Sequence, residues 1–436
     1  MDPVLLAQYQ QAYKDLDLFP LVNPENIQRF RVDYGLEVLV RLRQEIKASE
    51  ANGKFVFAGH RGCGKSTLLK RLALEMAASH DQAVVFFSIA DLIELSDITH
   101  TNILYAIALM LLDYADQEKV KVSQDIRETI LGWNDTVKTQ VTTQGHGGSL
   151  GVGGSWLKIF QASLQKERSF RQELETTFSK KISELVAQCD RIVAAIQIAT
   201  QQPVLVIIDD LDKLDLPLVE QIYRQNIKSL FSPQFRIVFT IPVSAVQEPQ
   251  IMGALNSEGI VRPHLFPVAK FFPKEQRRNP NAEPMAKPLQ QFLEILEKRL
   301  PADLLEPDTA RALVLHSGGV VRELVRIARE CCTECMVQLE LEPEAATQTI
   351  DADILAIALR NLRNDFSRQI GSDLYDQLVE IYETADAADT SDPGFVKLLH
   401  GLMVLEYIND ALWYDVHPIV VGLLQQKGRL LHHEPA

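Results

Sequence analysis

A glycine-rich stretch between an apolar run and an amphipathic run constrains the fold of this chain more than any other feature. Residues 59–67 read GHRGCGKST. The run before it, KFVFAG (54–59), is typical of a buried strand, and the run that begins near Lys65 has the apolar spacing of a helix. A strand, a glycine-rich loop and a helix in this order are the context in which G-x-x-x-x-G-K-[ST] cradles the phosphates of a nucleotide.

The residue types of this loop each predict a contact with a nucleotide. The glycines let the backbone curl so that successive N–H groups face phosphate oxygens. We expect Lys65 to reach the β- and γ-phosphates, the Ser66 hydroxyl to take a place on Mg²⁺, and Thr67 to lie near the α-phosphate. Cys63 is expected to contribute its backbone rather than a redox function. The predicted nucleotide-binding residues are Gly59, His60, Arg61, Gly62, Cys63, Gly64, Lys65, Ser66 and Thr67.

A second apolar run ends in a cluster of acids, VIIDDLDKLD (206–215). Unpaired carboxylates this close together repel, and a hard cation beside a triphosphate would offset their charge. We expect Asp209 to hold Mg²⁺ through its water shell and Asp210 to polarise the attacking water. The pattern leaves the role of Asp212 open, and it favours a helix cap or a solvated turn for Asp215.

Short apolar runs alternate with helical patterns along the first two thirds of the chain, which predicts an α/β fold with a parallel sheet. The further expected strands are 83–89, 203–209 and 235–242, with a fifth at 265–272. The apolar stretch 103–115 is too short to cross a bilayer and is expected to be a buried helix.

More residues separate the second and third strands than a simple crossover needs, so we expect an insertion there with a long helical stretch over 157–200. Its glycine run, 145–156, favours a flexible hairpin or disordered loop over a second phosphate site. Two strand-like runs around Asn409 and Asp410 resemble a winged-helix hairpin. The predicted organisation is an N-terminal helical segment (1–50), an α/β domain (51–272) with the insertion around 115–200, a helical lid (273–385) and a winged-helix-like domain (386–436).

The two motifs together resemble those of the AAA+/STAND division of P-loop ATPases. RIVFTIPVS (236–244) resembles the sensor-1 strand of that division, and HSGGVVRELVRIAREC (316–331) resembles its sensor-2 helix. The resemblance implies that Thr240 lies beside the γ-phosphate, that Arg322 covers the nucleotide, and that FRVDYG (30–35) helps to bind the base. It also implies a strand order of 5-1-4-3-2, ATP rather than GTP as the ligand, and assembly into a ring or with a partner.

Two positions qualify this resemblance. The second acid of the motif is often glutamate in the family and is Asp210 here, which favours a slow switch over a fast motor. A trans-acting arginine near the fifth strand would correspond to Arg262, for which a surface salt bridge is an equal alternative.

Charge limits the partners. The chain has a net charge of −14, and residues 351–436 carry six Lys and Arg against fourteen Asp and Glu, a net of −8. Because phosphate contacts dominate nucleic-acid affinity, this balance disfavours DNA or RNA as the partner of the C-terminal region. The basic residues Lys270, Lys274, Arg277 and Arg278 are interpreted as a solvated loop, with contact to a polyanion as the alternative.

These observations predict a cytoplasmic molecular switch that binds ATP and Mg²⁺, hydrolyses the nucleotide, and acts on or assembles with protein partners. Odd, scattered cysteines and the absence of a signal-peptide pattern at the N-terminus agree with the predicted compartment. Two alternatives stay open: a nucleic-acid loader or remodelling ATPase, and a low-turnover nucleotide-binding sensor subunit of a defence or signalling complex.

Overall fold

The computed structural model describes residues 3–134, 156–341, 349–408 and 411–430. These residues divide into two compact units, and each is described by itself. The α/β unit comprises Glu37–Ala58 and Leu68–Leu265, and the helical unit comprises Met1–Leu36, Gly59–Thr67 and Phe266–Ala436.

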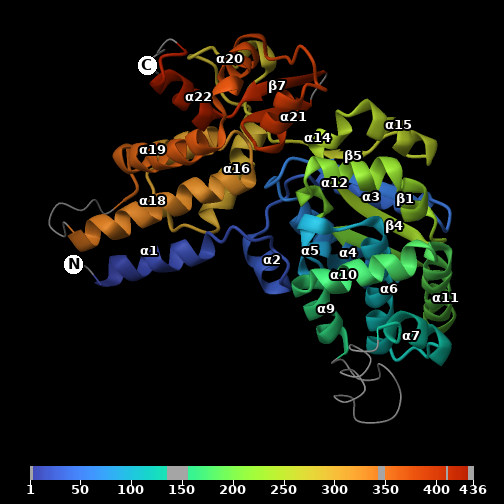
Figure 1. Cartoon of the computed structure of the whole chain (residues 1–436). Coiled ribbons are helices and arrows are strands. Elements are labelled where there is room, and N and C mark those ends of the chain that lie inside the picture. The colour runs from blue at the N-terminus through green and yellow to red at the C-terminus, as the bar shows by residue number, and fades with distance from the viewer. Residues whose placement is uncertain (1–2, 135–155, 342–348, 409–410, 431–436) are drawn as a thin grey trace. The chain divides into compact units, whose positions relative to one another are not determined.

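The α/β unit is built on a five-stranded parallel sheet with the order β2-β3-β4-β1-β5. This is the order 5-1-4-3-2 that the sequence resemblance implied, and it is confirmed. Strands β1, β4 and β5 of this sheet are labelled in Figure 1. The fifth strand is shorter than the apolar run that predicted it. The strands are β1 (Lys54–Gly59), β2 (Ala83–Ser88), β3 (Val204–Asp209), β4 (Arg236–Pro242) and β5 (His264–Phe266).

Strand β3 is the most deeply buried of these strands, because all six of its residues are buried. It pairs in parallel with β2 on one side and with β4 on the other. A strand covered on both faces reads as a continuous aliphatic run rather than an alternating one, which explains the sequence VLVIID. Its carboxyl end, at Asp209, lies in register with Ser88 at the end of β2.

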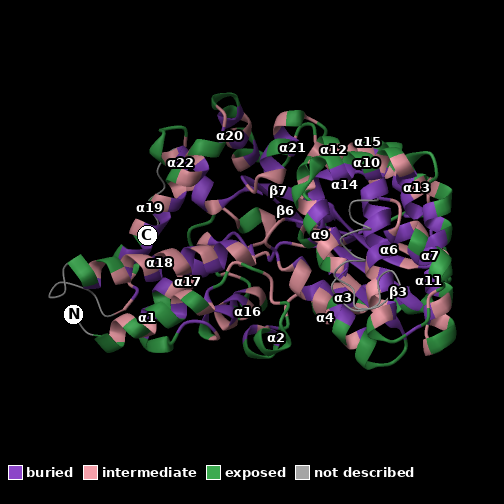
Figure 2. Cartoon of the chain, turned by 60° about the horizontal axis from the view of Figure 1, so that its bottom comes forward, coloured by how far each residue is buried: buried purple, intermediate pink, exposed green. Residues whose placement is uncertain are grey.

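Helix α6 forms much of the core of the α/β unit, and it lies in a region that Figure 2 draws largely in purple, the colour of buried residues. It packs against α11 and β2, which explains why its sequence is apolar nearly all round. The expectation of a buried helix over 103–115 is confirmed. The helices of this unit are α3 (Leu36–Ala48), α4 (Lys65–Ala78), α5 (Ile89–Leu92), α6 (His100–Gln117), α7 (Gln124–Leu131), α9 (Trp156–Lys166), α10 (Arg168–Ser179), α11 (Ile182–Thr200), α12 (Leu216–Glu220), α13 (Ile227–Phe231), α14 (Val243–Val246) and α15 (Pro249–Ser257).

The long connection from β2 to β3 contains α5, α6, α7, α9, α10 and α11. The single helical stretch expected over 157–200 is three helices, because the chain breaks near Glu167 and again near Lys181. The glycine run interpreted as a loop lies outside the described residues except for Trp156. That tryptophan is buried, and its indole N–H donates a hydrogen bond to Asp116 at 3.1 Å.

The helical unit packs an N-terminal helix against a helix of the last third of the chain. Helix α1 lies along α18, on which it packs (Figure 1). The ring of Tyr13 on α1 lies 4.0 Å from the guanidinium of Arg329 on α18. The helices of this unit are α1 (Pro3–Asp15), α2 (Pro24–Phe30), α16 (Ala286–Glu297), α17 (Pro307–His316), α18 (Val321–Leu341), α19 (Ala352–Gln369), α20 (Tyr375–Thr384), α21 (Pro393–His400) and α22 (Pro418–Gln426).

A two-stranded antiparallel sheet, β6 (Val404–Ile408) and β7 (Leu412–Val416), lies between α21 and α22. The strand-like runs expected around residues 409 and 410 are therefore present, although those two residues themselves lie outside the described ones. The assignment of a winged helix to this region and the predicted domain boundaries stay predictions.

Among the helices of the described ranges, none has the length and the apolar character that a membrane span requires.

The buried face of α6 predicts a large effect of truncating its side chains. Leu109 is fully buried, so Leu109→Ala should lower the free energy of unfolding by about 2–5 kcal/mol through lost contacts and a residual cavity. Leu74→Ala on α4 is the matched control, because Leu74 is 37% exposed and should change stability far less. Urea unfolding of both variants measures the difference, and equal effects would contradict this account of the core.

Candidate functional site

The phosphate loop leaves β1 at Gly59 and enters α4 at Lys65, as its sequence predicts. Gly62 and Gly64 have φ angles of 83° and 100°, in the left-handed region where glycine is favoured. Gly62 also has a close neighbour, because a Cβ at this position would lie 2.6 Å from the Cβ of Arg322. Glycine is therefore required at residue 62 both for the turn and for the approach of α18.

Lys65 is buried, and its ammonium group lies within the loop itself. The Nζ atom donates hydrogen bonds to the carbonyl oxygens of Gly59 at 2.9 Å and His60 at 2.8 Å. A cation held at the mouth of a loop of backbone amides creates a positive environment suited to an anion.

The other loop residues differ in burial. Cys63 is fully buried, whereas Arg61 and Ser66 are half-buried. The hydroxyl of Thr67 accepts a hydrogen bond from the backbone N–H of Leu21 at 3.0 Å. That bond ties the first turn of α4 to the N-terminal segment within the helical unit.

His60 has a contact that the sequence did not indicate. Its side chain is 2% exposed, and its Nε2 atom accepts a hydrogen bond from the backbone N–H of Glu406 on β6 at 2.8 Å. Burial, together with nearby Lys65 and His417, lowers the pKa of His60 to about 3. The imidazole is therefore neutral near pH 7 and acts as an acceptor at Nε2.

The sensor-like helix α18 begins against the phosphate loop. The backbone N–H of Arg322 donates to the carbonyl of Gly62 at 2.9 Å, and the side chain of Arg322 runs past the same glycine. The residues predicted to cover the nucleotide from the lid and to hold its phosphates thus lie side by side within the helical unit.

The segment 30–35 contacts Phe266, which in turn lies against the start of the phosphate loop. The ring of Tyr34 lies 5.2 Å from that of Phe266, and a Cβ at Gly35 would lie 2.1 Å from the Phe266 ring. The carbonyl of Phe266 in turn would lie 2.7 Å from a Cβ at Gly59. The segment that the resemblance assigned to base binding is therefore next to the start of the loop.

In the α/β unit, three carboxylates gather at the end of β3. Asp209, Asp210 and Asp212 are all buried, and one oxygen atom of each lies within 4.8 Å of the others. Carboxylate oxygens are the ligands that Mg²⁺ prefers. The residues therefore fit a divalent cation, and Asp212, whose role the sequence left open, belongs to the cluster.

Asp210 is held by two partners and by an unusual backbone conformation. Its Oδ2 atom accepts a hydrogen bond from Ser88 at 2.7 Å, and its Oδ1 atom lies 2.7 Å from Nζ of Lys213. Its φ angle is 70°, which non-glycine residues adopt at a cost. Asp210 also raises the pKa of the Asp91 carboxyl, after the larger effect of burial.

Thr240 lies at the end of β4, next to this cluster. Its hydroxyl accepts from the backbone N–H of Leu211 at 2.9 Å and donates to the carbonyl of Ile208 at 3.3 Å. The threonine therefore fixes the turn that follows β3. Asp215, by contrast, is exposed at the N-cap of α12, in agreement with its predicted structural role.

The two sets of residues follow strands of one sheet. The phosphate loop continues from β1, the acidic cluster ends β3, and only β4 separates these strands. Loops and side chains at the carboxyl ends of parallel strands are where α/β folds bind ligands.

Ser88 and Lys213, the partners of Asp210, were missed by sequence reasoning. The signal for Ser88 was available: it is the last residue of a strand that neighbours β3, and polar residues at adjacent strand ends meet at one edge of the sheet. No local pattern pointed to Lys213.

Arg262, the predicted trans-acting arginine, is exposed in the turn between α15 and β5. Within the described ranges it forms no ion pair, so the alternative of an intramolecular salt bridge finds no support there.

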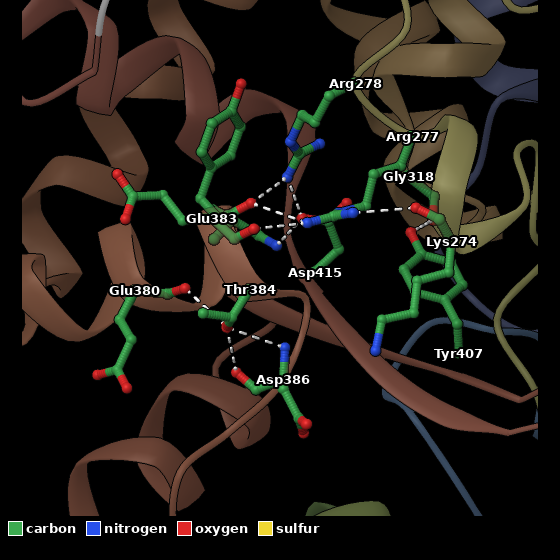
Figure 3. Close-up of polar contacts among 12 residues, drawn as sticks. Lys274, Arg277, Arg278, Gly318, Glu380, Glu383, Thr384, Asp386, Tyr407 and Asp415 are labelled. Carbon is green, nitrogen blue, oxygen red and sulfur yellow. Dashed lines mark hydrogen bonds and ion pairs between the residues drawn. The ribbon is translucent and has the colours of Figure 1, made fainter.

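For Arg277 and Arg278, two of the four basic residues, the interpretation as a solvated loop was wrong. Arg277 donates to the carbonyl of Glu383 at 2.8 Å (Figure 3). Arg278 donates to the carbonyl of Tyr382 at 3.3 Å. Arg278 also pairs with Asp415 on β7, and its guanidinium lies 3.7 Å from the centre of the Tyr382 ring. The two arginines cap the C-terminal carbonyls of α20, where cations are favourable.

Comparison with protein-family models identifies residues 40–247 as similar to the KAP family P-loop domain. The matched range includes both the phosphate loop and the acidic cluster. No curated protein sequence matches the chain.

Solved structures with similar architecture include the ORC1 protein of Aeropyrum pernix in complex with DNA, at 12% identity and a TM-score of 0.38 over 93% of this chain and 96% of that one. Cdc6p from Pyrobaculum aerophilum matches at 10% identity, a TM-score of 0.38, and 93% and 97% coverage. Drosophila ORC bound to DNA matches at 13% identity, a TM-score of 0.34, and 95% and 91% coverage.

The anchoring of the basic loop predicts a pH-dependent loss of stability. Arg278→Ala should cost about 1–3 kcal/mol, because it removes the ion-pair partner of the buried Asp415 carboxylate. Arg429→Ala is the matched control, because its partner Asp376 is exposed and such pairs contribute little. Urea unfolding at two pH values measures both variants.

Burial raises the pKa of Asp415, and Arg278 opposes that shift. A carboxyl whose pKa is higher in the folded chain binds more protons there, so stability falls as pH rises through that pKa. Without Arg278 the shift grows, so the variant should lose more stability at pH 8 than at pH 5. A loss independent of pH would contradict this role of Asp415.

Proposed function

We propose that this chain, whose five-stranded sheet and phosphate loop form a P-loop NTPase fold, is a molecular switch that binds ATP with Mg²⁺ and hydrolyses it. The observation that carries the proposal is the pairing of a glycine-rich loop after β1 with a buried acidic cluster after β3 of the same sheet. This pairing supplies both the groups that hold a triphosphate and those that hold its metal ion.

The loop supports the binding of phosphate. Lys65 is buried at the loop, where its ammonium donates hydrogen bonds to two backbone carbonyls. A bound triphosphate would replace these carbonyls as the partner of the ammonium. We propose that residues 59–67 bind the phosphates, with Ser66 on Mg²⁺ and Thr67 near the α-phosphate. The proximity of Phe266 and Tyr34 to Gly59 supports base binding by the segment 30–35.

The acidic cluster supports the metal. Asp209 is buried beside two further carboxylates, an arrangement that is costly without a cation. When bound, Mg²⁺ would neutralise charge on the phosphates. We propose that Asp209 holds its water shell, that Asp210 orients and deprotonates the attacking water, and that Thr240 holds the turn carrying these acids while lying beside the γ-phosphate.

The contacts of helix α18 with the phosphate loop support the proposal of a nucleotide-dependent switch. We propose that Arg322 contacts the bound nucleotide and that hydrolysis changes the hold of α18 on the loop, since its backbone already bonds Gly62. A ligand shifts the equilibrium between two conformations only if it makes different contacts in each of them, and such a change at α18 would provide that difference.

The net charge of −8 over residues 351–436 favours a protein partner or self-assembly, with Arg262 as the candidate trans-acting residue.

A nucleic-acid loader and a low-turnover sensor subunit are the competing functions. Stimulation of hydrolysis by DNA with a steep salt dependence would favour the loader. Slow, unstimulated hydrolysis with tight retention of nucleotide would favour the sensor.

Lys65→Ala tests the phosphate loop. Removing the ammonium should weaken ATP binding by at least about 10- to 100-fold, because charge-assisted hydrogen bonds contribute ~1.5–3 kcal/mol each. Equilibrium titration with a fluorescent ATP analogue measures the affinity, and Lys228→Ala on the exposed face of α13 is the control. Wild-type affinity and turnover in Lys65→Ala would show that the loop does not bind phosphate.

Asp210→Asn tests the hydrolytic role. The variant keeps the size of the side chain but loses the base, so ATP binding should persist while turnover falls by roughly 10²- to 10⁴-fold. Asp215→Asn, at the exposed N-cap of α12, is the matched control and should leave turnover unchanged. Phosphate release under saturating ATP is the measurement, and undiminished release in Asp210→Asn would remove this residue from the reaction.

A further inference from the structure

One side chain of the phosphate loop connects it to the C-terminal β6–β7 hairpin. His60 is buried, and its Nε2 atom accepts a hydrogen bond from the backbone N–H of Glu406, 346 positions along the chain. The bond lies wholly within the helical unit. Glu406 offers this N–H from the first strand of the hairpin, β6.

The backbone of the same residue holds the lysine of the loop. Nζ of Lys65 donates to the carbonyl of His60 at 2.8 Å and to that of Gly59 at 2.9 Å. A phosphate group that attracts the ammonium competes with both carbonyls, so its arrival changes the forces on the peptide groups on either side of residue 60. His60 is therefore bonded to the phosphate-binding lysine on one side and to β6 on the other.

Two further loop residues, Gly62 and Cys63, interact with α18 and β6. The carbonyl of Gly62 accepts from the N–H of Arg322. Burial raises the pKa of the Tyr407 phenol on β6, and Asp415 and then the buried thiol of Cys63 raise it further. Tyr407 itself donates to the carbonyl of Gly318 at 2.8 Å. Through His60 and Gly62, the loop is thus bonded to β6 and to the start of α18.

We propose that His60 is a positioning residue that couples occupancy of the phosphate loop to strand β6 through its hydrogen bond with Glu406. This inference rests on the proposed function and deepens it, because it names β6 as the element whose contacts change with the bound nucleotide. When phosphate binds, the ammonium of Lys65 moves away from the carbonyl of His60. Residue 60 then changes its orientation, and the hydrogen bond between its side chain and the N–H of Glu406 breaks.

A histidine suits this position because it stays neutral there. The lowered pKa keeps Nε2 available as an acceptor across the physiological range, so the contact responds to phosphate rather than to pH. Its Nδ1 atom is buried with no hydrogen-bond partner among the residues that the structure describes. A buried polar atom without a partner is uncommon and is often retained for function.

Hydrogen exchange at the Glu406 amide tests the proposal. The full chain is compared without nucleotide, with ADP, and with a non-hydrolysable ATP analogue, and binding is measured in the same samples with a fluorescent analogue. Exchange at Glu406 should become about 2- to 10-fold faster with the ATP analogue, which is the net worth of one hydrogen bond.

Two variants separate the side-chain acceptor from packing. In His60→Leu the Glu406 amide should exchange fast with or without nucleotide, so that the nucleotide-dependent difference disappears. His60→Gln retains an acceptor and should restore part of the difference. His80→Leu, at an exposed histidine, is the control and should behave as the wild type.

The outcomes distinguish the two proposals. Failure of the wild-type chain to bind any nucleotide would refute the proposed function. Nucleotide binding with unchanged or slower exchange at Glu406 would refute the coupling through His60 and leave the proposed function standing. The wild-type comparison gives this answer even where His60→Leu does not fold, and an undiminished difference in a folded His60→Leu would also refute the coupling.

Discussion

The hydrogen bonds that hold the carbonyl groups of the phosphate loop determine what the rest of the molecule can do with it. The carbonyls of Gly59 and His60 face the ammonium of Lys65, and that of Gly62 faces the backbone of Arg322. In a trans peptide the C=O and N–H point in opposite directions. Fixing the carbonyls therefore fixes where the amides that follow them point, before any ligand arrives. A loop ordered in this way loses less entropy on binding an anion.

Whereas hydrogen bonds stabilise the phosphate loop, the acidic cluster is energetically unfavourable without a cation. Three buried carboxylates at one strand end repel one another, and Asp210 in addition has a left-handed backbone conformation. Lys213 offsets part of the charge, and Ser88 stabilises the carboxylate of Asp210 with a hydrogen bond. The cost is explained when the cluster serves a cation and a reaction, which is the basis of the proposed function.

Local patterns predicted most of the α/β unit, because each motif there is contiguous. The strand, loop and helix around residues 54–78 follow from burial periodicity and glycine placement, and the strand order followed from the resemblance. The division of residues 157–200 into three helices did not follow, since the breaks near Glu167 and Lys181 have no glycine or proline to mark them. Helical periodicity records which face is buried, and it is insensitive to a change of helix direction.

Contacts across long sequence separations were beyond local reasoning. The bond between His60 and Glu406 joins residues 346 positions apart, and one of its partners is a backbone N–H with no sequence signature. Arg277 and Arg278 look like surface charge in a polar loop, yet they bond the carbonyls that end α20. Such contacts depend on how helices are placed in space, which a charge pattern does not encode.

The two arginines also change the argument about partners. They were half of the four basic residues that could have met a polyanion, and their guanidinium groups are committed to Tyr382, Glu383 and Asp415 within the chain. Phosphate contacts need cations that can exchange water and counterions for the nucleic acid. The cationic surface available near this acidic region is thus smaller than the sequence suggests. This supports the proposal that the partner of the helical unit is a protein surface or a second copy of the chain rather than a nucleic acid.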